Sequence, residues 1–392
     1  MISSSTTNST HRITQIDAYR SYAVFGLFIV HCVELFELHW FDPKPTAVFD
    51  TVFLLFAGKA FAMFALSFGI SHFIISERAI ARGESFVARY AWRLALLILI
   101  GLLHTAIYRG DILVLLGIAG LLLLPIDQRK NGWVLGVLAT GLLVNVPLIV
   151  RLVQSYHFQD GVLALMSASN DSSMAAYMRG ELGESIQANL GSGNLSKWIF
   201  MLESGRVAQI MGLFLLGHML SRARFFTELD KFQFYRWVII IVGGGATIAL
   251  YSSQDALVSL FPSNAYWGTN FYASNLVAGW INLIFMIVQT AIFFEVWYLL
   301  RGRLLSALAN AGRMSLTLYI GQSIVFVPIL YNFGFGLWDD VTAMQMALIA
   351  VIGFAIQVAG ANLWFRFFQY GPLEWIWRAA TQFNPNLPIR VK

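Results

Sequence analysis

Long apolar segments recur along almost the whole chain, and they restrict its fold more than any other sequence feature. A helix that crosses the hydrocarbon core of a membrane needs about twenty predominantly apolar residues. About ten windows meet this requirement, at 17–36, 48–75, 90–108, 111–126, 132–153, 205–220, 236–252, 275–300, 313–332 and 341–366. We therefore predict an all-α protein, a polytopic bundle of transmembrane helices, in which the fourth and sixth windows are the weakest.

The composition excludes an ordinary soluble protein. Of the 392 residues, 58% are hydrophobic and 12% are charged, whereas about a quarter of the residues in a soluble domain are charged. The net charge of +5 is attributed to cytoplasmic loops and not to nucleic-acid binding. With ten spans, most of the 26 lysines and arginines fall on the side of the termini, so both termini are expected in the cytoplasm.

Polar segments flank and interrupt the apolar windows. Residues 1–16 are rich in Ser and Thr and lack the apolar core of a signal peptide, so we expect a polar cytoplasmic tail before the transmembrane domain at 17–366. The outer loop at 154–200 is long for a structureless connection, so we expect amphipathic helices that form a lid; a solvated connector is the alternative. Residues 367–392 are expected to form a cytoplasmic surface helix and tail.

Two pairs of ionisable residues have the same spacing. Arg20 precedes His31 in the first window by as many positions as Arg93 precedes His104 in the third. With about 1.5 Å and about 100° per helical residue, each arginine lies on the same helix face as its histidine, about 16 Å away. The arginines are thus expected near the cytosol and the histidines near mid-membrane, where both can face one cavity. Alternatively, the arginines only set the topology, and the histidines bond to neighbouring helices.

This arrangement suits group transfer from an anionic donor in the cytosol. Guanidinium groups bind phosphate in a bidentate manner, and a neutral histidine can accept a proton from an attacking hydroxyl or amine. Acyl-coenzyme A combines phosphate groups with a reactive thioester. We therefore expect it as the co-substrate, with Arg20, Arg93 and Arg313 as candidate ligands of its phosphates.

Further ionisable side chains lie within the apolar windows. Glu34 is one helical turn from His31, where it either orients the imidazole or is solvated at the outer interface. Lys59 and Asp111 are expected to be structural partners, because an unpaired charge inside a membrane is costly. Cys32 is rotated away from His31, and we expect it to serve packing.

The ninth window opens with a polar stripe. Ser315, Tyr319 and Gln322 share one helix face, which should point into the protein. Gly312 and Arg313 precede them, where free backbone N–H groups, the helix dipole and a guanidinium favour an anion. We expect a donor phosphate there; ordinary helix capping is the alternative.

The remaining histidines and the carboxylates indicate no metal centre. His72 and His218 fall near the cytoplasmic ends of their windows, and we interpret them as interfacial. The sequence contains no metal-binding spacing such as His-Glu-x-x-His. We therefore expect no metal.

Ordered motifs resemble those of a known family. The segments are GKAFAMFALSFGI at 58–70, GLLHTAIYRGDIL at 101–113, GRMSLTLYIGQS at 312–323 and GPLEWIWR at 371–378. They resemble the signatures of the YeiB-like family of bacterial inner-membrane proteins, which is similar to the transmembrane acyltransferases. In some of these, a first-span arginine, ten residues and a histidine are required, and Arg20 and His31 reproduce that spacing. His104 and Asp111 match the YeiB-like pattern better, so the resemblance implies His104 beside His31 as a candidate base.

The resemblance implies an integral-membrane acyltransferase in the bacterial inner membrane. It would move an acyl group, with acetyl as the expected one, from acyl-coenzyme A to a hydroxyl or amine of a sugar or lipid-linked acceptor. The catalytic candidates are His31, His104, Asp111 and Glu34, and transfer is either direct or through an acyl-histidine. The alternatives are a transporter or flippase and a structural or signalling protein. Expected partners are membrane lipids, acyl-coenzyme A, the acceptor and, as one option, a second copy in a homodimer.

Overall fold

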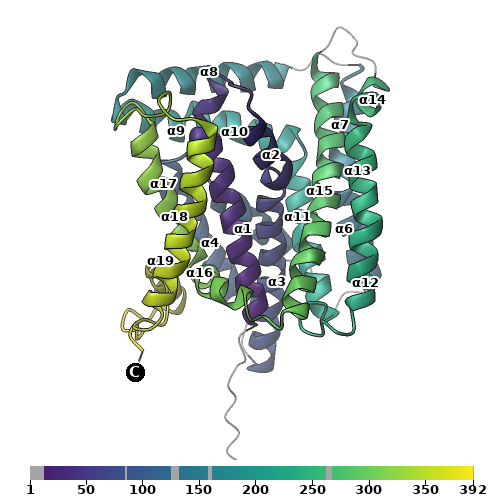
Figure 1. Ribbon diagram of the computed structural model, residues 1–392, viewed down its shortest axis with the longest axis vertical. Coiled ribbons are helices and arrows are strands. Elements are labelled where there is room, and N and C mark those ends of the chain that lie inside the picture. Colours follow the sequence, from purple (N-terminus) through teal and green to yellow (C-terminus); the bar gives the residue numbers. More distant parts are fainter. Residues whose placement is uncertain (1–12, 84–85, 125–131, 158–160, 262–266, 392) are drawn as a thin grey trace, which may run out of the picture.

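The structure is a computed structural model that describes residues 13–83, 86–124, 132–157, 161–261 and 267–391, and it consists of helices (Figure 1). In chain order the α-helices are α1 (Thr14–Val33), α2 (Ala47–Phe56), α3 (Ala60–Ala81), α4 (Phe86–Thr105), α5 (Leu113–Leu123), α6 (Gly132–Leu143), α7 (Val146–Gln154), α8 (Gly161–Arg179), α9 (Leu182–Leu190), α10 (Ser192–Glu203), α11 (Arg206–Arg222), α12 (Gln233–Val238), α13 (Gly244–Ser252), α14 (Gln254–Ser259), α15 (Trp267–Leu299), α16 (Ala309–Arg313), α17 (Ser315–Leu330), α18 (Ala343–Trp364) and α19 (Pro372–Gln382). Shorter helical segments are η1 (Leu35–Trp40), η2 (Ile239–Gly243) and η3 (Leu305–Leu308). Within the described residues, β-pairing is limited to an isolated bridge between Phe368 and Arg390, so the all-α prediction is confirmed.

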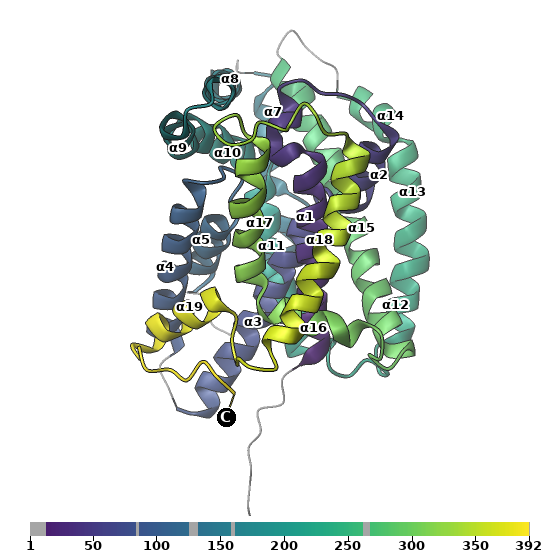
Figure 2. The same cartoon turned by 60° about the vertical axis from the view of Figure 1, so that its left-hand side comes forward.

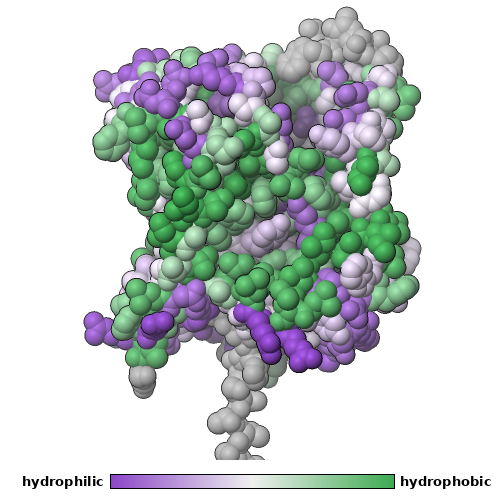
Figure 3. Space-filling model, in the orientation of Figure 1, coloured by the Kyte–Doolittle hydropathy of each residue, from purple (hydrophilic) through white to green (hydrophobic). Residues whose placement is uncertain are grey.

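The helices form a multi-pass membrane protein. Within the described ranges, 6 helices are long and apolar enough to cross a membrane, or up to 9 if each of three bent helix pairs is one span. Figure 3 shows apolar side chains around the middle of the molecule and hydrophilic side chains at both ends. The fourth predicted window forms only α5, with 11 residues, so the count of ten spans stays a prediction.

Helix breaks divide the windows at 48–75 and 132–153, which predicted continuous spans, and another break lies at the start of the window at 205–220. Gly58 separates α2 from α3, Asn145 separates α6 from α7, and Gly205 precedes α11. Their φ values are +77°, 69° and 71°, respectively. This left-handed conformation commonly ends a helix. Hydropathy windows record only apolar content, so they do not detect such breaks.

The centre of the bundle is α1, which packs against α3, α16 and α18 (Figure 2). Glycines permit the closest helix contacts, because small residues let helix backbones approach within a membrane. A Cβ atom at Gly69 of α3 would collide with the carbonyl group of Phe214 in α11, and one at Gly312 would collide with that of Asp17 in α1. These contacts position α1, α3, α11 and α16 for the site described below.

Helices α8, α9 and α10 lie across one end of the bundle (Figure 1), and we call them the cap. They occupy most of the segment expected as the outer loop. In α9, Asn189 donates hydrogen bonds to the carbonyl oxygens of Ala106 and Ile107, both at 3.0 Å. In α8, Tyr177 donates to the side-chain oxygen of Asn189 at 2.7 Å. The cap is therefore bonded to the residues that follow α4.

The opposite end of the bundle, where α1 begins, is called the N-terminal face. Helix α19 lies at this end (Figure 2), and the chain ends there too (Figure 1). Gly371 is the N-cap of α19 and Pro372 is its first residue, as suits a residue without a backbone N–H. The start of α1 and the end of the chain thus lie at the same end of the bundle.

Candidate functional site

A cavity of about 300 Å³ at the N-terminal face is rich in arginine. The arginines that line it are Arg20, Arg78, Arg93, Arg313 and Arg378, and the lining carboxylates are Asp17 and Glu374. Ser315 and Tyr319 of the predicted polar stripe also line it. The excess of guanidinium groups favours a ligand with several negative charges, such as phosphates.

Aromatic rings hold two of these arginines. The guanidinium of Arg93 lies 3.8 Å from the ring centroid of Trp377 in α19, and that of Arg313 lies 3.7 Å from the ring centroid of Phe365. Arg313 also donates to the carbonyl oxygen of Gln369 at 3.1 Å. Stacking holds a guanidinium in place through its face, so the N–H groups at its edge remain oriented for hydrogen bonds.

Arg20 is oriented by polar partners. It donates to the Asp17 carboxylate at 2.8 Å and to the Ser71 hydroxyl at 2.6 Å. The predicted phosphate ligands Arg20, Arg93 and Arg313 therefore line the same cavity.

The helix N-terminus expected to bind a donor phosphate already holds a carboxylate. Glu374 accepts the backbone N–H groups of Leu316 and Thr317 at 2.8 and 3.1 Å, and the Thr317 hydroxyl at 2.6 Å. Burial raises the pKa of Glu374, and these hydrogen bonds oppose that shift. A carboxylate does occupy the start of α17, but it belongs to the protein, so the N–H groups of Leu316 and Thr317 are already bonded.

A second cavity, of about 660 Å³, lies on the side of the cap. We call it the cap-side cavity. Its lining includes His31, Glu34, Glu37, Tyr108, Arg109, Lys197 and Arg206. The first predicted Arg–His pair is therefore divided between two cavities, with Arg20 at the N-terminal face and His31 on the side of the cap.

Strained backbone places the acidic residues of the cap-side cavity. Leu35, Phe36 and Glu37 have φ values of 52°, 48° and 84°, which side chains other than glycine rarely adopt. The chain therefore turns directly after α1, and the ring of Phe36 lies 5.4 Å from that of His31. This turn explains why α1 ends at Val33, before the predicted limit at 36.

Arg109 pairs with Glu37 beneath the cap. The two side chains form a short ion pair, and Arg109 donates to the Ser173 hydroxyl of α8 at 2.7 Å. Burial by itself would lower the pKa of Arg109, but the charge of Glu37 outweighs it and raises the pKa. Arg109 therefore stays charged and joins the cap to the turn after α1.

His104 and Asp111 form a buried pair. Nδ1 of His104 lies 2.7 Å from Oδ2 of Asp111, and the other carboxylate oxygen accepts the Val114 N–H at 3.0 Å. A carboxylate only accepts, so Nδ1 carries the proton and Nε2 presents a lone pair. Among the residues that the structure describes, none is a hydrogen-bond partner of Nε2. The pair thus has the form of an oriented general base.

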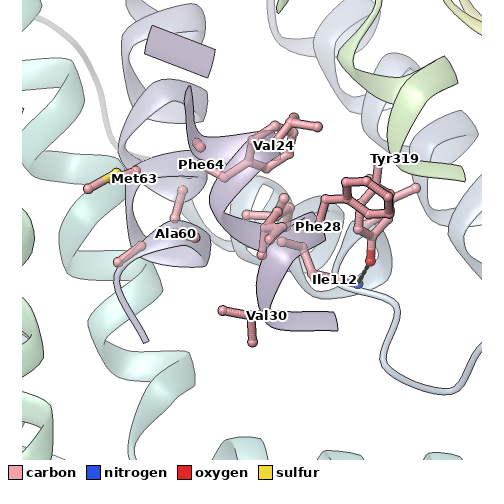
Figure 4. Close-up of a cluster of buried hydrophobic side chains, with 14 of the residues drawn as sticks. Val24, Phe28, Val30, Ala60, Met63, Phe64, Ile112 and Tyr319 are labelled. Atoms are coloured by element: carbon pink, nitrogen blue, oxygen red, sulfur yellow. Dashed lines mark hydrogen bonds between the residues drawn. The ribbon is translucent and has the colours of Figure 1, made fainter. Parts of the chain in front are cut away.

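Two tyrosines connect this pair to both cavities. The ring centroid of His104 lies 5.2 Å from that of Tyr319 and 6.2 Å from that of Tyr108. Tyr319 lines the arginine-rich cavity at the N-terminal face, and Tyr108 lines the cap-side cavity. The ring of His31 lies 5.3 Å from Tyr108 and 6.2 Å from Tyr319. Figure 4 shows Tyr319 beside Phe28, with its hydroxyl accepting the Ile112 N–H at 3.3 Å. We call His31, His104, Tyr108 and Tyr319 the histidine layer.

Lys59 was expected to pair with Asp111, but the two side chains have different partners. The ammonium group of Lys59 donates to the carbonyl oxygen of Phe53 at 3.2 Å, while Asp111 is bonded to His104. The Phe53 carbonyl oxygen also accepts the backbone N–H of Ala57 at 3.1 Å, so it bonds the lysine through its second lone pair. Lys59 is thus a structural residue with a different partner.

Two other predicted site residues have different contacts from those expected. Glu34 accepts a hydrogen bond from Trp40 at 3.0 Å and does not orient His31. The side-chain amide of Gln322 donates to Gln357 of α18 at 2.9 Å, and Gln322 lines neither of the two cavities described above. The helix face of Gln322 does point into the protein, but Gln322 contacts α18 there and does not face a cavity.

His72 and His218, which we interpreted as interfacial, form a buried contact with each other. Their Nδ1 atoms lie 3.2 Å apart, between α3 and α11. No cluster of three or more His, Cys, Asp or Glu side chains suited to a metal occurs in the described part of the chain. Cys32 is fully buried in the core, where it packs as expected.

Sequence reasoning missed several residues that line the cavities. Arg78 and Arg378 were treated only as topological charges, and Arg109, Lys197 and Arg206 only as charges on the outer side. Their shared signal is a position at the end of an apolar segment, which is also where topological charges occur. Only the folded chain distinguishes these two roles.

The chain matches two family models. Residues 12–177 match heparan-alpha-glucosaminide N-acetyltransferase, catalytic, and residues 220–384 match Protein of unknown function (DUF418). It is 26% identical to the uncharacterized protein YxaH of Bacillus subtilis (strain 168), over 96% of this chain and 95% of that protein. It is 25% identical to the uncharacterized protein YeiB of Escherichia coli (strain K12), over 94% of this chain and 96% of that protein. The resemblance inferred from the motifs is thereby confirmed.

Proposed function

The chain belongs to the YeiB-like family, and from this premise we propose that it is a transmembrane acyltransferase. One observation carries the proposal: an arginine-rich cavity and a cavity on the opposite side approach each other at a layer that contains an oriented histidine. The match of residues 12–177 to an acetyltransferase catalytic model supports this reaction class. The two substrates would enter from opposite faces.

The proposed donor is acyl-coenzyme A, with acetyl as the acyl group. Its phosphates would contact Arg20, Arg93, Arg313 and the neighbouring arginines, and its thioester would reach toward Tyr319. This requires the N-terminal face to be cytosolic, with ten spans and both termini in the cytoplasm of a bacterial inner membrane. The bias of lysine and arginine toward that side supports this orientation.

The proposed transfer uses a histidine as general base. The acceptor's hydroxyl or amine loses a proton to Nε2 of His104, or to His31, while its oxygen or nitrogen bonds to the thioester carbon. The carbon–sulfur bond breaks, and the histidine returns the proton to the coenzyme A thiolate. Asp111 stabilises the protonated imidazole of His104. A route through an acyl-histidine would differ by forming acylated protein with the donor alone.

Calorimetric titration with acetyl-coenzyme A tests the donor site. We expect binding to purified wild-type protein and a loss of about tenfold or more in affinity for Arg93→Gln and Arg313→Gln, because each removes a charge-assisted contact. Lys231→Gln is the matched control, since Lys231 is an exposed cation on the same side that pairs with Glu228. Absence of binding to the folded wild type would refute the proposal.

A transporter is the second candidate, because bent helices are typical of transporter folds. The bends are 42° between α6 and α7, 65° before α11 and 76° before α17. Proteoliposomes with acetyl-coenzyme A outside and acceptor sugars inside separate the two functions. A transferase acetylates the sugar without moving it, whereas a transporter moves it unmodified.

A further inference from the structure

We infer that the cap-side cavity binds an acceptor sugar that carries an acid group, with Lys197 and Arg206 as its ligands. The role of this sugar as the acceptor depends on the proposed transferase function. The binding site rests on the charges and contacts of the cavity itself.

Two cations of the cavity form no direct ion pair with any carboxylate among the described residues, although the charge of Glu34 acts on Arg206 and those of Asp111 and Glu37 act on Lys197. The Nζ atom of Lys197 is buried and has no hydrogen-bond partner in the described portion of the chain. The guanidinium of Arg206 lies 4.6 Å from the ring centroid of Phe200 and 5.5 Å from that of Phe61, and it forms no ion pair with another described residue. Both side chains line the cavity. A buried ammonium group without a hydrogen-bond partner is costly, and an anion in the cavity would supply one.

The carboxylates of the cavity cannot balance these cations. Glu37 is already paired with Arg109. Glu34 accepts a hydrogen bond from Trp40, and it carries at most one negative charge against the two positive charges of Lys197 and Arg206. The cavity therefore has an excess of positive charge, which an anionic ligand would neutralise.

The rest of the lining suits a sugar. Ser167, Asn170 and Ser196 offer groups that bond hydroxyls, and Trp40 offers an aromatic face. His31 lines the same cavity, so a ligand held by Lys197 and Arg206 would lie on the side of the histidine layer where an acceptor is needed. The acid group is a carboxylate or a phosphate on the sugar.

Binding measured without acetyl-coenzyme A tests this inference. The probes are two matched pairs, glucosamine 6-phosphate with glucosamine and glucuronate with glucose, titrated into purified full-length protein and followed by saturation-transfer NMR. We expect at least one acidic sugar to bind about tenfold more tightly than its neutral partner, and the pair that shows the preference identifies the acid. Lys197→Gln and Arg206→Gln should each remove most of the preference. Arg179→Gln should retain it, because Arg179 lies on the exposed surface of the cap and pairs with Glu184.

Equal binding of acidic and neutral sugars by folded wild-type protein, or no binding, would overturn the inference. A preference that survives in both Lys197→Gln and Arg206→Gln would also overturn it. Acetyl-coenzyme A binding is measured on the same preparation. A charge-dependent sugar site without donor binding would refute the transferase and leave this site standing, whereas donor binding without sugar preference would refute only this inference.

Discussion

At the scale of single residues, the pair of His104 and Asp111 defines the chemistry that the site can perform. The carboxylate holds Nδ1 as a donor, and the backbone N–H of Val114 fixes the carboxylate in turn. Because this orientation leaves the lone pair on Nε2, the pair resembles the base and orienting acid of known triads. Among the described residues, no carboxylate is bonded to His31 in this way, and Glu34 is bonded to Trp40.

Replacing Asp111 by Asn should abolish turnover and leave donor binding intact. An amide can donate to Nδ1 and thereby place the proton on Nε2, where it blocks the base. In a catalytic triad this tautomer change lowers the rate by about 10⁴-fold, and we expect a loss of similar order here. Initial rates of acetyl transfer and calorimetry with acetyl-coenzyme A measure the two effects.

Asp339→Asn is the control for this substitution. Asp339 is an exposed carboxylate that pairs with Lys44 at 2.5 Å, so its loss should leave the transfer rate unchanged. A rate in Asp111→Asn within a few-fold of wild type would contradict the role of His104 as base.

At the scale of elements, helix termini and glycine contacts hold the arginine-rich cavity together. Helix α19 supplies Glu374, Trp377 and Arg378 to the cavity lining, and Glu374 ties it to the start of α17. Trp377 also donates a hydrogen bond to the carbonyl oxygen of Arg93 at 2.9 Å. The arginine-rich cavity is therefore completed by α19, which is not one of the candidate membrane spans.

Glu374→Ala should destabilise the protein by about 1–2 kcal/mol, the usual cost of losing a helix N-cap. Its raised pKa also has a consequence for pH dependence. The folded state binds the proton of Glu374 more tightly than the unfolded state does, so this group makes stability fall as pH rises from the ordinary glutamate pKa of 4.5 through the raised pKa of the folded state. Thermal unfolding in detergent between pH 4 and pH 8 measures both effects relative to wild type, and Glu374→Gln should lack the pH-dependent part.

Gly69→Ala tests the contact between α3 and α11. The added Cβ would collide with the Phe214 carbonyl group, and such overpacking costs about 1–3 kcal/mol. Gly321→Ala is the matched control, because no atom of the described residues lies within 4 Å of the Cβ position there. We expect the midpoint of thermal unfolding to fall below that of wild type for Gly69→Ala but not for Gly321→Ala. Equal midpoints for the two variants would contradict the close contact between α3 and α11 at Gly69.

At the scale of the whole molecule, the decisive feature is the separation of two cavities by a thin layer of side chains. The cap closes one end, and α19 covers part of the other (Figure 2). Opposite access is needed for transfer between a cytosolic donor and an acceptor on the other side. The orientation of the two faces in the membrane is therefore a prediction that bears directly on function.

Cysteine labelling measures this orientation, because Cys32 is buried and is the chain's only cysteine. We expect a cysteine introduced at Arg179, on the cap, to react with an impermeant maleimide added outside intact cells. One introduced at Lys231 should react only after the membrane is permeabilised. The reverse pattern would invert the topology, and reaction of both in intact cells would contradict the separation of the faces.

The membrane class, the helical fold and the residue types of the site follow from the sequence alone. Runs of apolar residues near membrane length determine helices, because no other open structure satisfies backbone polar groups in lipid. The recurrence of His104 and Asp111 in family motifs identified both members of the buried pair. The spacing of Arg20 and His31 likewise identified two lining residues, although it suggested one shared cavity.

Only the tertiary structure decided which of these side chains meet. Asp111 bonds to His104, whereas Lys59 bonds to the carbonyl oxygen of Phe53 near the end of α2. Glu374 reaches the start of α17 across more than fifty positions of the chain, a contact that no local pattern reports. The positive φ values at Leu35, Phe36 and Glu37 turn the chain into the cap-side cavity. Local sequence determines what a segment can form, whereas partners distant in the chain are selected by packing of the whole bundle.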